Sequence, residues 1–250
     1  MLGAGGMIMQ LRVFQRGFNF SQDGPGNRLV YHLQGCNLRC PWCSNPEGLS
    51  LDGGWTITPE ALVAEAVRSR LMFFEGGGVT LTGGEVTLQW KAVFHLLSLL
   101  KAEGIHTCIE TNGTSPYLPR LFPVLDLLIM DLKHHDSARH KAVIGMGIEQ
   151  TIANLNAALN AGQQLALRIP LIGGFNASAE DAKQFAALLN RLNTGKRITV
   201  ELLPYHEYGR SKYDKLHLPY TMDSDAHVSN ETRLQMEEIL RHSGLTVIRT

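Results

Sequence analysis

The feature that most constrains the fold is a repeated alternation of short apolar segments with longer amphipathic ones. Nearly continuous runs of Val, Ile and Leu are typical of strands buried on both faces of a parallel sheet. The expected strands cover residues 28–33, 79–82, 105–110, 125–131, 165–172 and 198–203, with a short one at 245–249. The expected helices cover 58–74, 88–103, 151–161, 178–193 and 230–242. The pattern predicts an α/β protein with helices outside a parallel sheet, and periodicity alone does not separate a doubly wound sheet from a β/α barrel.

Length and charge exclude several classes of protein. The 250 residues can form one large domain, expected to span 1–250. Lys and Arg together balance Asp and Glu at 23 each, so no bulk field favours nucleic acid or an anionic membrane. No run approaches the roughly 18 apolar residues of a membrane span. Residues 1–9 lack the features of a signal peptide and are expected to be a leader, so we expect a cytoplasmic protein.

Three of the four cysteines, Cys36, Cys40 and Cys43, follow one another in a C-x3-C-x2-C run. Three thiolates can hold three corners of a cubane iron–sulfur cluster and leave the fourth iron open to a ligand. A zinc site, with His32 as a fourth ligand, and a disulfide stay open as alternatives, although zinc sites usually pair their cysteines differently.

Polar and glycine residues gather just after the expected strands. They are the cysteine run, Gly83 to Glu85, Glu110 to Gly113, Asp131 to Lys133, and His206. The carboxyl ends of parallel strands meet at one edge, where β/α barrels place their active sites. Taken singly, these residues have simpler interpretations as turns, helix caps, a solvated lysine and a loop histidine. Cys108 is expected to be a small buried residue, and His134 and His135 are expected at the surface.

The segments around the cysteines resemble a known family. Asp23-Gly-Pro-Gly-Asn-Arg28, Gln34-Gly-Cys36 and Cys43-Ser-Asn-Pro-Glu-Gly48 are similar to the radical S-adenosylmethionine enzymes that activate glycyl radical enzymes. The matches run in the family's order over about residues 18 to 213. Residues 45–78 contain no further cysteine, so the chain resembles the minimal form without a ferredoxin-like insert.

The resemblance implies a partial barrel of six (β/α) units, open on one side. It also implies a [4Fe–4S] cluster on Cys36, Cys40 and Cys43, whose free iron binds S-adenosylmethionine, and a 5′-deoxyadenosyl radical that removes a hydrogen atom from a glycine of a partner enzyme. The expected partner is pyruvate formate-lyase or a relative, and Asp23 is expected to grip its glycine-bearing loop.

The resemblance also implies roles for single residues. The residues expected to bind S-adenosylmethionine are Trp42, Ser44, Gly83, Gly84, Glu85, Asp131, Leu132, Lys133, Arg168 and His206. A monovalent cation is associated with Glu110, Thr111, Ile129 and Asp131. Two positions depart from the family pattern: Glu110 stands where Asp is frequent, and Val86 stands where many members have Pro.

Flavodoxin or ferredoxin is the expected electron donor, and a monomer is expected because the open side of the barrel must admit the partner. Two alternatives remain: a radical enzyme acting on a small molecule, and a non-enzymatic zinc-binding domain.

Overall fold

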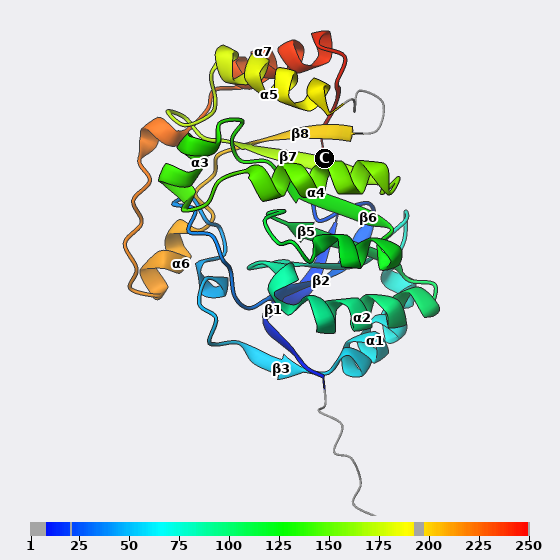
Figure 1. Ribbon diagram of the computed structural model, residues 1–250. Coiled ribbons are helices and arrows are strands. Elements are labelled where there is room, and N and C mark those ends of the chain that lie inside the picture. Colours follow the sequence, from blue (N-terminus) through cyan, green and yellow to red (C-terminus); the bar gives the residue numbers. More distant parts are fainter. Residues whose placement is uncertain (1–8, 21, 193–197, 250) are drawn as a thin grey trace, which may run out of the picture.

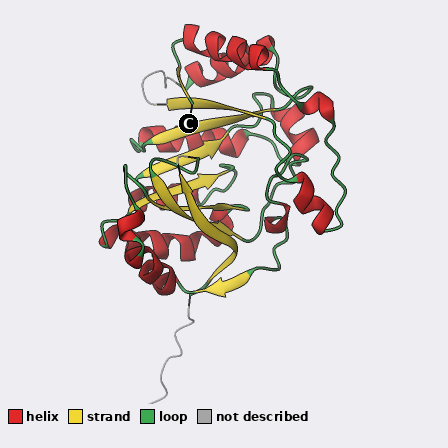
Figure 2. Ribbon diagram, turned by 180° about the vertical axis from the view of Figure 1, so that it is seen from behind, coloured by secondary structure: helices red, strands yellow, loops and turns green. Residues whose placement is uncertain are grey.

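The computed structural model describes residues 9–20, 22–192 and 198–249, and these form one sheet flanked by helices (Figures 1 and 2). The strand order is β3-β1-β2-β4-β5-β6-β7-β8-β9. Six strands run parallel: β2 (Asn27–Leu33), β4 (Gly78–Gly83), β5 (His106–Thr111), β6 (Leu127–Asp131), β7 (Leu165–Leu171) and β8 (Ile198–Pro204). A short β9 (Thr246–Ile248) extends them beside β8. Because β3 and β9 are the two ends of the order, the sheet is not closed, and the predicted α/β class and open architecture are confirmed. The expected leader falls almost wholly on residues 1–8, which lie outside the described residues.

Two strands at the N-terminal end of the sheet were not predicted. β1 (Leu11–Phe20) pairs antiparallel with β2, and β3 (Trp55–Ile57) pairs with β1 only over Leu11 to Val13. A register shift between Val13 and Gln15 breaks the alternation of buried and exposed residues along β1, so the sequence pattern does not predict this strand. Among the described strands, the half of β1 beyond Val13 is therefore paired on one side only.

The main helices lie outside the sheet and agree with the sequence pattern (Figure 1). They are α1 (Pro59–Arg68), α2 (Trp90–Ala102), α4 (Glu149–Asn160), α5 (Ala179–Arg191) and α7 (Asn230–His242). Ser178 and Asp181 form the expected capping box of α5. The first helix is shorter than predicted, because it ends at Arg68 and gives way to a 3-10 turn, Arg70–Met72. Two short helices, α3 (Ser137–Ile144) and α6 (Arg210–Lys215), were not predicted. None of the described helices is long and apolar enough to cross a lipid bilayer.

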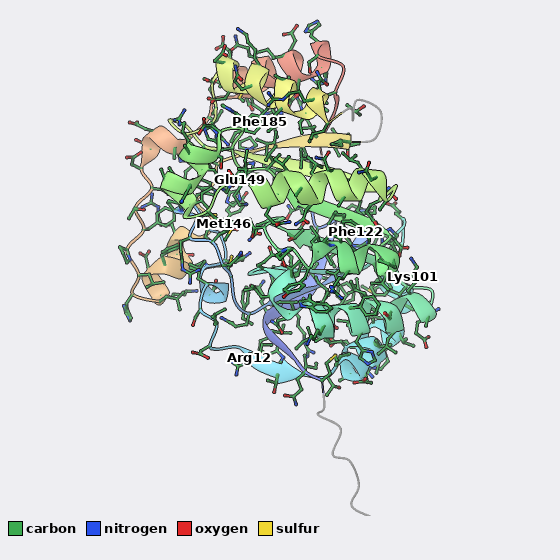
Figure 3. All side chains as sticks on the ribbon, in the orientation of Figure 1. Arg12, Lys101, Phe122, Met146, Glu149 and Phe185 are labelled. Carbon is green, nitrogen blue, oxygen red and sulfur yellow. The ribbon has the colours of Figure 1, made fainter. Side chains whose placement is uncertain are left out.

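A large leucine- and valine-rich core joins the sheet to its helices, and a smaller apolar cluster lies under the cysteine run. The smaller cluster includes Leu38, Ile172 and Phe175, with Met146 packed against it (labelled in Figure 3). Cys108 is fully buried on β5, as predicted.

The expectation that His134 and His135 are surface residues is wrong. His134 is fully buried; its Nδ1 accepts from the Asp136 N–H at 2.8 Å, so its Nε2 donates to the Phe175 carbonyl at 3.0 Å. His135 is half-buried and bonds Asp181 Oδ1 at 2.8 Å. A histidine whose two ring nitrogens both find partners can be buried in its neutral form, which sequence position alone does not reveal.

Candidate active site

A cavity of about 260 Å³ brings together most of the residues expected to bind a cofactor. It is lined by Cys36, Cys40 and Cys43 together with Trp42, Ser44, Gly83, Gly84, Glu110, Thr111, Asp131, Lys133, Arg168 and His206. These residues come from the ends of β4 to β7 and from the segments that follow β2, β6 and β8. A parallel sheet thus gathers residues that lie up to 170 positions apart in the sequence, which the sequence pattern predicts.

Four of the predicted residues do not line this cavity. Leu132 and Ile129 are buried in the apolar interior, and Asp23 lines a neighbouring cavity of about 600 Å³. Glu85 is fully buried, and its carboxylate accepts from the N–H and hydroxyl of Thr87, from the Thr111 hydroxyl and from the Asn112 N–H, at 2.5 to 3.0 Å. Through these contacts Glu85 holds the end of β5 beside the turn after β4. They occupy the Glu85 carboxylate and do not support the direct contact with the cofactor that was expected of it.

The cysteine loop is held by contacts with its own backbone and with the turn after β4. The Arg39 guanidinium donates to the carbonyls of Cys36 and Leu38 at 2.7 and 2.8 Å. Gly84 lies so close to this loop that an added Cβ would stand 2.0 Å from the Gly35 carbonyl oxygen. A glycine is therefore required at position 84 for the loop to rest against the end of the sheet.

The arrangement of the three thiols fits an iron–sulfur cluster better than a zinc ion. All three cysteines are free, and their sulfur atoms do not all lie within 4.8 Å of one another. A zinc ion with Zn–S bonds of about 2.3 Å would hold its sulfurs roughly 3.8 Å apart, whereas a cubane spreads its ligands over three irons. His32, the alternative fourth zinc ligand, lines the neighbouring cavity and not the one that holds the cysteines.

The surroundings of the thiols also suit metal ligation. Backbone N–H groups of Leu38 and Asn45 donate to the sulfurs of Cys36 and Cys43 at 3.5 and 3.4 Å. Burial raises the pKa of Cys36 to about 11 and of Cys40 to about 12, and it also raises the pKa of Cys43. The thiols therefore hold their protons near neutral pH until a metal displaces them, and the amide donors then stabilise the sulfur charge.

A buried ionic network also lines the cavity. Arg168 Nε donates to Glu201 at 2.9 Å, and its Nη1 donates to Glu110 at 2.5 Å. Burial raises the pKa of Glu110, and the Arg168 guanidinium opposes that rise. Burial alone would lower the pKa of Arg168, but the two carboxylates outweigh it and raise the pKa. The partners of Arg168 are thus protein carboxylates, whereas a cofactor carboxylate was expected.

A second ion pair, Lys133 with Asp131, and the rings of Trp42 and His206 also line the cavity. Lys133 donates to Asp131, which raises the lysine pKa against the effect of burial. Trp42 packs on Phe175 with ring centroids 5.2 Å apart. Burial lowers the pKa of His206, so its imidazole is neutral at pH 7 and can donate or accept a hydrogen bond.

Several residues of the site were not predicted as ligands, although Asn45 and Asn112 lie in segments that the sequence singles out. Thr82, Asn45, Asn112 and Tyr205 line the cavity, and Glu201 anchors Arg168 from β8. A signal for Glu201 existed, since it is an acid in an apolar strand that follows the strand carrying Arg168. Charges in two neighbouring buried strands are expected to pair.

Comparison with known proteins agrees with this geometry. The model of the radical SAM superfamily matches residues 30–186. The chain is 35% identical to the pyruvate formate-lyase-activating enzyme of Clostridium pasteurianum, over 88% of this chain and 92% of that one. It is 32% identical to the pyruvate formate-lyase 1-activating enzyme of Escherichia coli K12, over 90% of this chain and 93% of that one.

Two solved structures share the fold. A domain of the pyruvate-formate lyase-activating enzyme from Bacteroides vulgatus matches with a TM-score of 0.55 at 29% identity, covering 69% of this chain and 98% of that one. A radical SAM methyltransferase from Sphaerobacter thermophilus matches with a TM-score of 0.68 at 21% identity, covering 92% of this chain and 67% of that one. Since the superfamily model spans more than half of the chain, and relatives above 30% identity are covered almost end to end, the chain belongs to the radical SAM superfamily and, within it, to the family of pyruvate formate-lyase activating enzymes.

Proposed function

We propose that this chain activates a glycyl radical enzyme, pyruvate formate-lyase or a relative, by removing a hydrogen atom from a glycine of that partner. The observation that carries the proposal is one cavity lined both by three free thiols and by ion-paired side chains. When bound, a [4Fe–4S] cluster and S-adenosylmethionine supply the one-electron chemistry that produces the hydrogen-abstracting radical.

The chain's own residues would bind and orient the cluster and S-adenosylmethionine and shield them from solvent. Cys36, Cys40 and Cys43 would hold the cluster, and Gly83 and Gly84 line the same cavity, with Gly84 packed closely against the loop that carries the cysteines. Lys133 is a cation that can meet the carboxylate of S-adenosylmethionine, and Arg168, whose partners are protein carboxylates, shapes the cavity beside it. His206 and Trp42 can pack on the nucleoside. Ser44, Thr111 and Asp131 line the same cavity and carry hydrogen-bonding side chains. We assign Leu132 and Glu85 a positioning role, because both are buried away from the cavity.

A partner's loop has a route to this cavity. The neighbouring cavity of about 600 Å³ shares Ser44, Glu110, Arg168 and His206 with the first, so the two are adjacent. Asp23 lines the larger one, and its Oδ2 accepts from Asn19 of β1. A glycine carried on an extended loop that enters past Asp23 would arrive beside the cysteines.

The expected monovalent cation does not fit the site as it stands. The carboxylate of Glu110 is bonded to Thr82 and Arg168, and that of Asp131 to Lys133. Thr111 lines the cavity, but Ile129 does not. A cation would have to displace a resident arginine or lysine, so we give it no role in the reaction.

We further propose that flavodoxin or ferredoxin supplies the electron, and that the chain acts in the cytoplasm as a single-domain monomer. A reducing compartment would keep the four free cysteines reduced. A monomer leaves the unpaired half of β1 free for the partner.

Anaerobic reconstitution with iron and sulfide, followed by low-temperature EPR, tests the first half of the proposal. We expect a [4Fe–4S]⁺ signal that changes when S-adenosylmethionine is added, and release of 5′-deoxyadenosine. A colourless protein with stoichiometric zinc would contradict the proposal. Cofactor cleavage that is stimulated by a small molecule and never by a glycyl radical enzyme would favour a small-molecule enzyme instead.

A further inference from the structure

Five large apolar side chains are exposed together on one side of the molecule. Leu71 is 97% exposed, and Phe18, Phe20, Met72 and Phe74 are each about half exposed, at 45 to 51%. We call these five residues the apolar patch. Isolated exposed apolar residues are common, but a contiguous group of this size marks an interaction surface.

Two segments far apart in the sequence lie side by side in the patch. Phe18 and Phe20 come from the free half of β1, and the other three come from the 3-10 turn after α1 and the residue pair that follows it. The rings of Phe20 and Phe74 have centroids 5.9 Å apart, and Phe18 lies 6.3 Å from Phe73.

The turn is fixed in place beside the sheet. Asn27, at the start of β2, donates from its side chain to the Met72 carbonyl at 2.9 Å and from its backbone to the Phe74 carbonyl at 3.4 Å. The exposed apolar groups are therefore presented by ordered backbone, so little ordering entropy has to be lost when a partner covers them.

The patch borders the entrance proposed for the partner's loop. Phe18 lines the larger cavity together with Asn19, Gln22 and Asp23. The loop from Asp23 to Gly26 packs directly on the turn, since a Cβ added to Gly26 would lie 2.3 Å from the Phe74 carbonyl oxygen. A folded protein that inserts a loop past Asp23 would also contact the surface beside the cavity, and through Phe18 the patch is part of that surface.

Two of the arginines near the patch are neutralised within the chain. Arg16 on β1 pairs with Glu65 at 2.6 Å, and Arg70 in the turn pairs with Glu103 at 3.3 Å. The surface therefore offers apolar area and, along β1, unpaired backbone groups, which suits a protein surface better than a nucleic acid.

From these contacts we propose that the apolar patch docks the folded body of the glycyl radical enzyme around its glycine-bearing loop. The inference rests on the proposed function and deepens it. Cofactor chemistry is assigned to the cavity, and recognition of the whole partner is assigned to a separate surface on β1 and the turn after α1. Residues of the patch that become buried in the complex are expected to act as hot spots.

The test compares a full-length partner with a short peptide. Leu71→Asp is the variant of choice because a side chain 97% exposed contributes little to folding. Leu234→Asp is the matched control, since Leu234 is 47% exposed on α7, at the opposite end of the sheet. Both reconstituted variants and the wild-type protein are assayed with pyruvate formate-lyase and with a peptide that spans its radical glycine.

We expect Leu71→Asp to raise the KM for full-length pyruvate formate-lyase about tenfold or more and to leave the KM for the peptide unchanged. Cleavage of S-adenosylmethionine without a partner should also be unchanged, and Leu234→Asp should match the wild type throughout. An unchanged KM for the full-length partner, or an equal rise with the peptide, would overturn the inference. So would sedimentation showing a wild-type dimer that Leu71→Asp dissociates while the KM stays constant, because the patch would then belong to a second copy of the chain. A wild-type protein that cleaves S-adenosylmethionine but forms no glycyl radical would instead contradict the proposed function.

Discussion

Arg168 of β7 and Glu201 of β8 lie opposite each other in the parallel sheet, and the guanidinium Nε donates to the carboxylate at 2.9 Å. The same guanidinium reaches Glu110 on β5 at 2.5 Å. The Arg168 guanidinium thus links β5, β7 and β8 beside the cofactor cavity, and Glu201 fixes its position from β8.

Replacing Glu201 should therefore affect both stability and cofactor binding. Glu201→Ala removes one of the two carboxylates that offset the buried charge of Arg168, and breaking a buried pair costs about 3 to 5 kcal/mol of unfolding free energy. Glu201→Gln keeps an acceptor and should cost less, while S-adenosylmethionine affinity falls about tenfold because Arg168 is less well oriented. Urea unfolding and equilibrium binding measure the two effects. Wild-type affinity in Glu201→Gln would contradict the positioning role.

Cofactor binding should not depend on potassium or sodium. Both carboxylates that a monovalent cation would use are paired with Arg168 and Lys133. We expect the Kd for S-adenosylmethionine to agree within about threefold in potassium, sodium and tetramethylammonium salts of equal ionic strength. Glu110→Asp, whose shorter side chain retracts from Arg168, tests whether that ion pair is the reason, since it should gain a dependence on the cation. A strong potassium requirement in the wild type would show that the ion pairs open.

Replacing a cysteine that lines the cavity should prevent cluster assembly, whereas replacing Cys108 should not. Cys36→Ala removes a thiol that lines the cavity, so the reconstituted protein should lose its iron and its visible absorption. Cys108→Ala is the matched control, because Cys108 is fully buried on β5 and does not line the cavity; it should keep its iron and lose only about 1 kcal/mol of stability. Iron analysis and absorption spectra are the readouts. Full iron content in Cys36→Ala would count against the assigned ligands.

Acid should destabilise the protein through His134. Burial lowers its pKa in the folded state, so the unfolded chain takes up its proton first as the pH falls through about 6.5. This contribution is complete above that pH and is lost below it, because protonation also breaks the bond that Nδ1 accepts from Asp136. Urea unfolding at pH 7.5 and 5.5 should show a smaller loss in His134→Asn than in the wild type. Replacing an exposed histidine, in His242→Asn, should leave the loss of stability between the two pH values as it is in the wild type. An equal loss in all three proteins would refute the assignment of this effect to His134.

The sequence predicts those parts of the molecule whose structure depends on residues that are close together in the chain. Unbroken apolar runs predict the parallel strands, and Ser178 with Asp181 predicts the start of α5. The cysteine spacing and the residues after each strand predict the cavity, because the carboxyl ends of parallel strands must meet.

The remainder depends on contacts between distant residues. β1 carries a register shift and an exposed half, so its periodicity is lost. Glu201 acquires its role only when β8 pairs with β7, and Glu85 is occupied by Thr87, Thr111 and Asn112 in a way that no spacing reveals. The apolar patch joins residues 18–20 to 71–74 and becomes a surface only after folding.

The proposed removal of a hydrogen atom from a glycine of a partner protein can be followed with an isotope. Its most direct test uses pyruvate formate-lyase labelled with α-deuterated glycine, incubated anaerobically with the reduced, reconstituted protein and S-adenosylmethionine. We expect a glycyl radical signal in the EPR spectrum of the partner and one deuterium in the 5′-deoxyadenosine that is released. Release of 5′-deoxyadenosine without deuterium, and with no glycyl radical, would contradict the proposal.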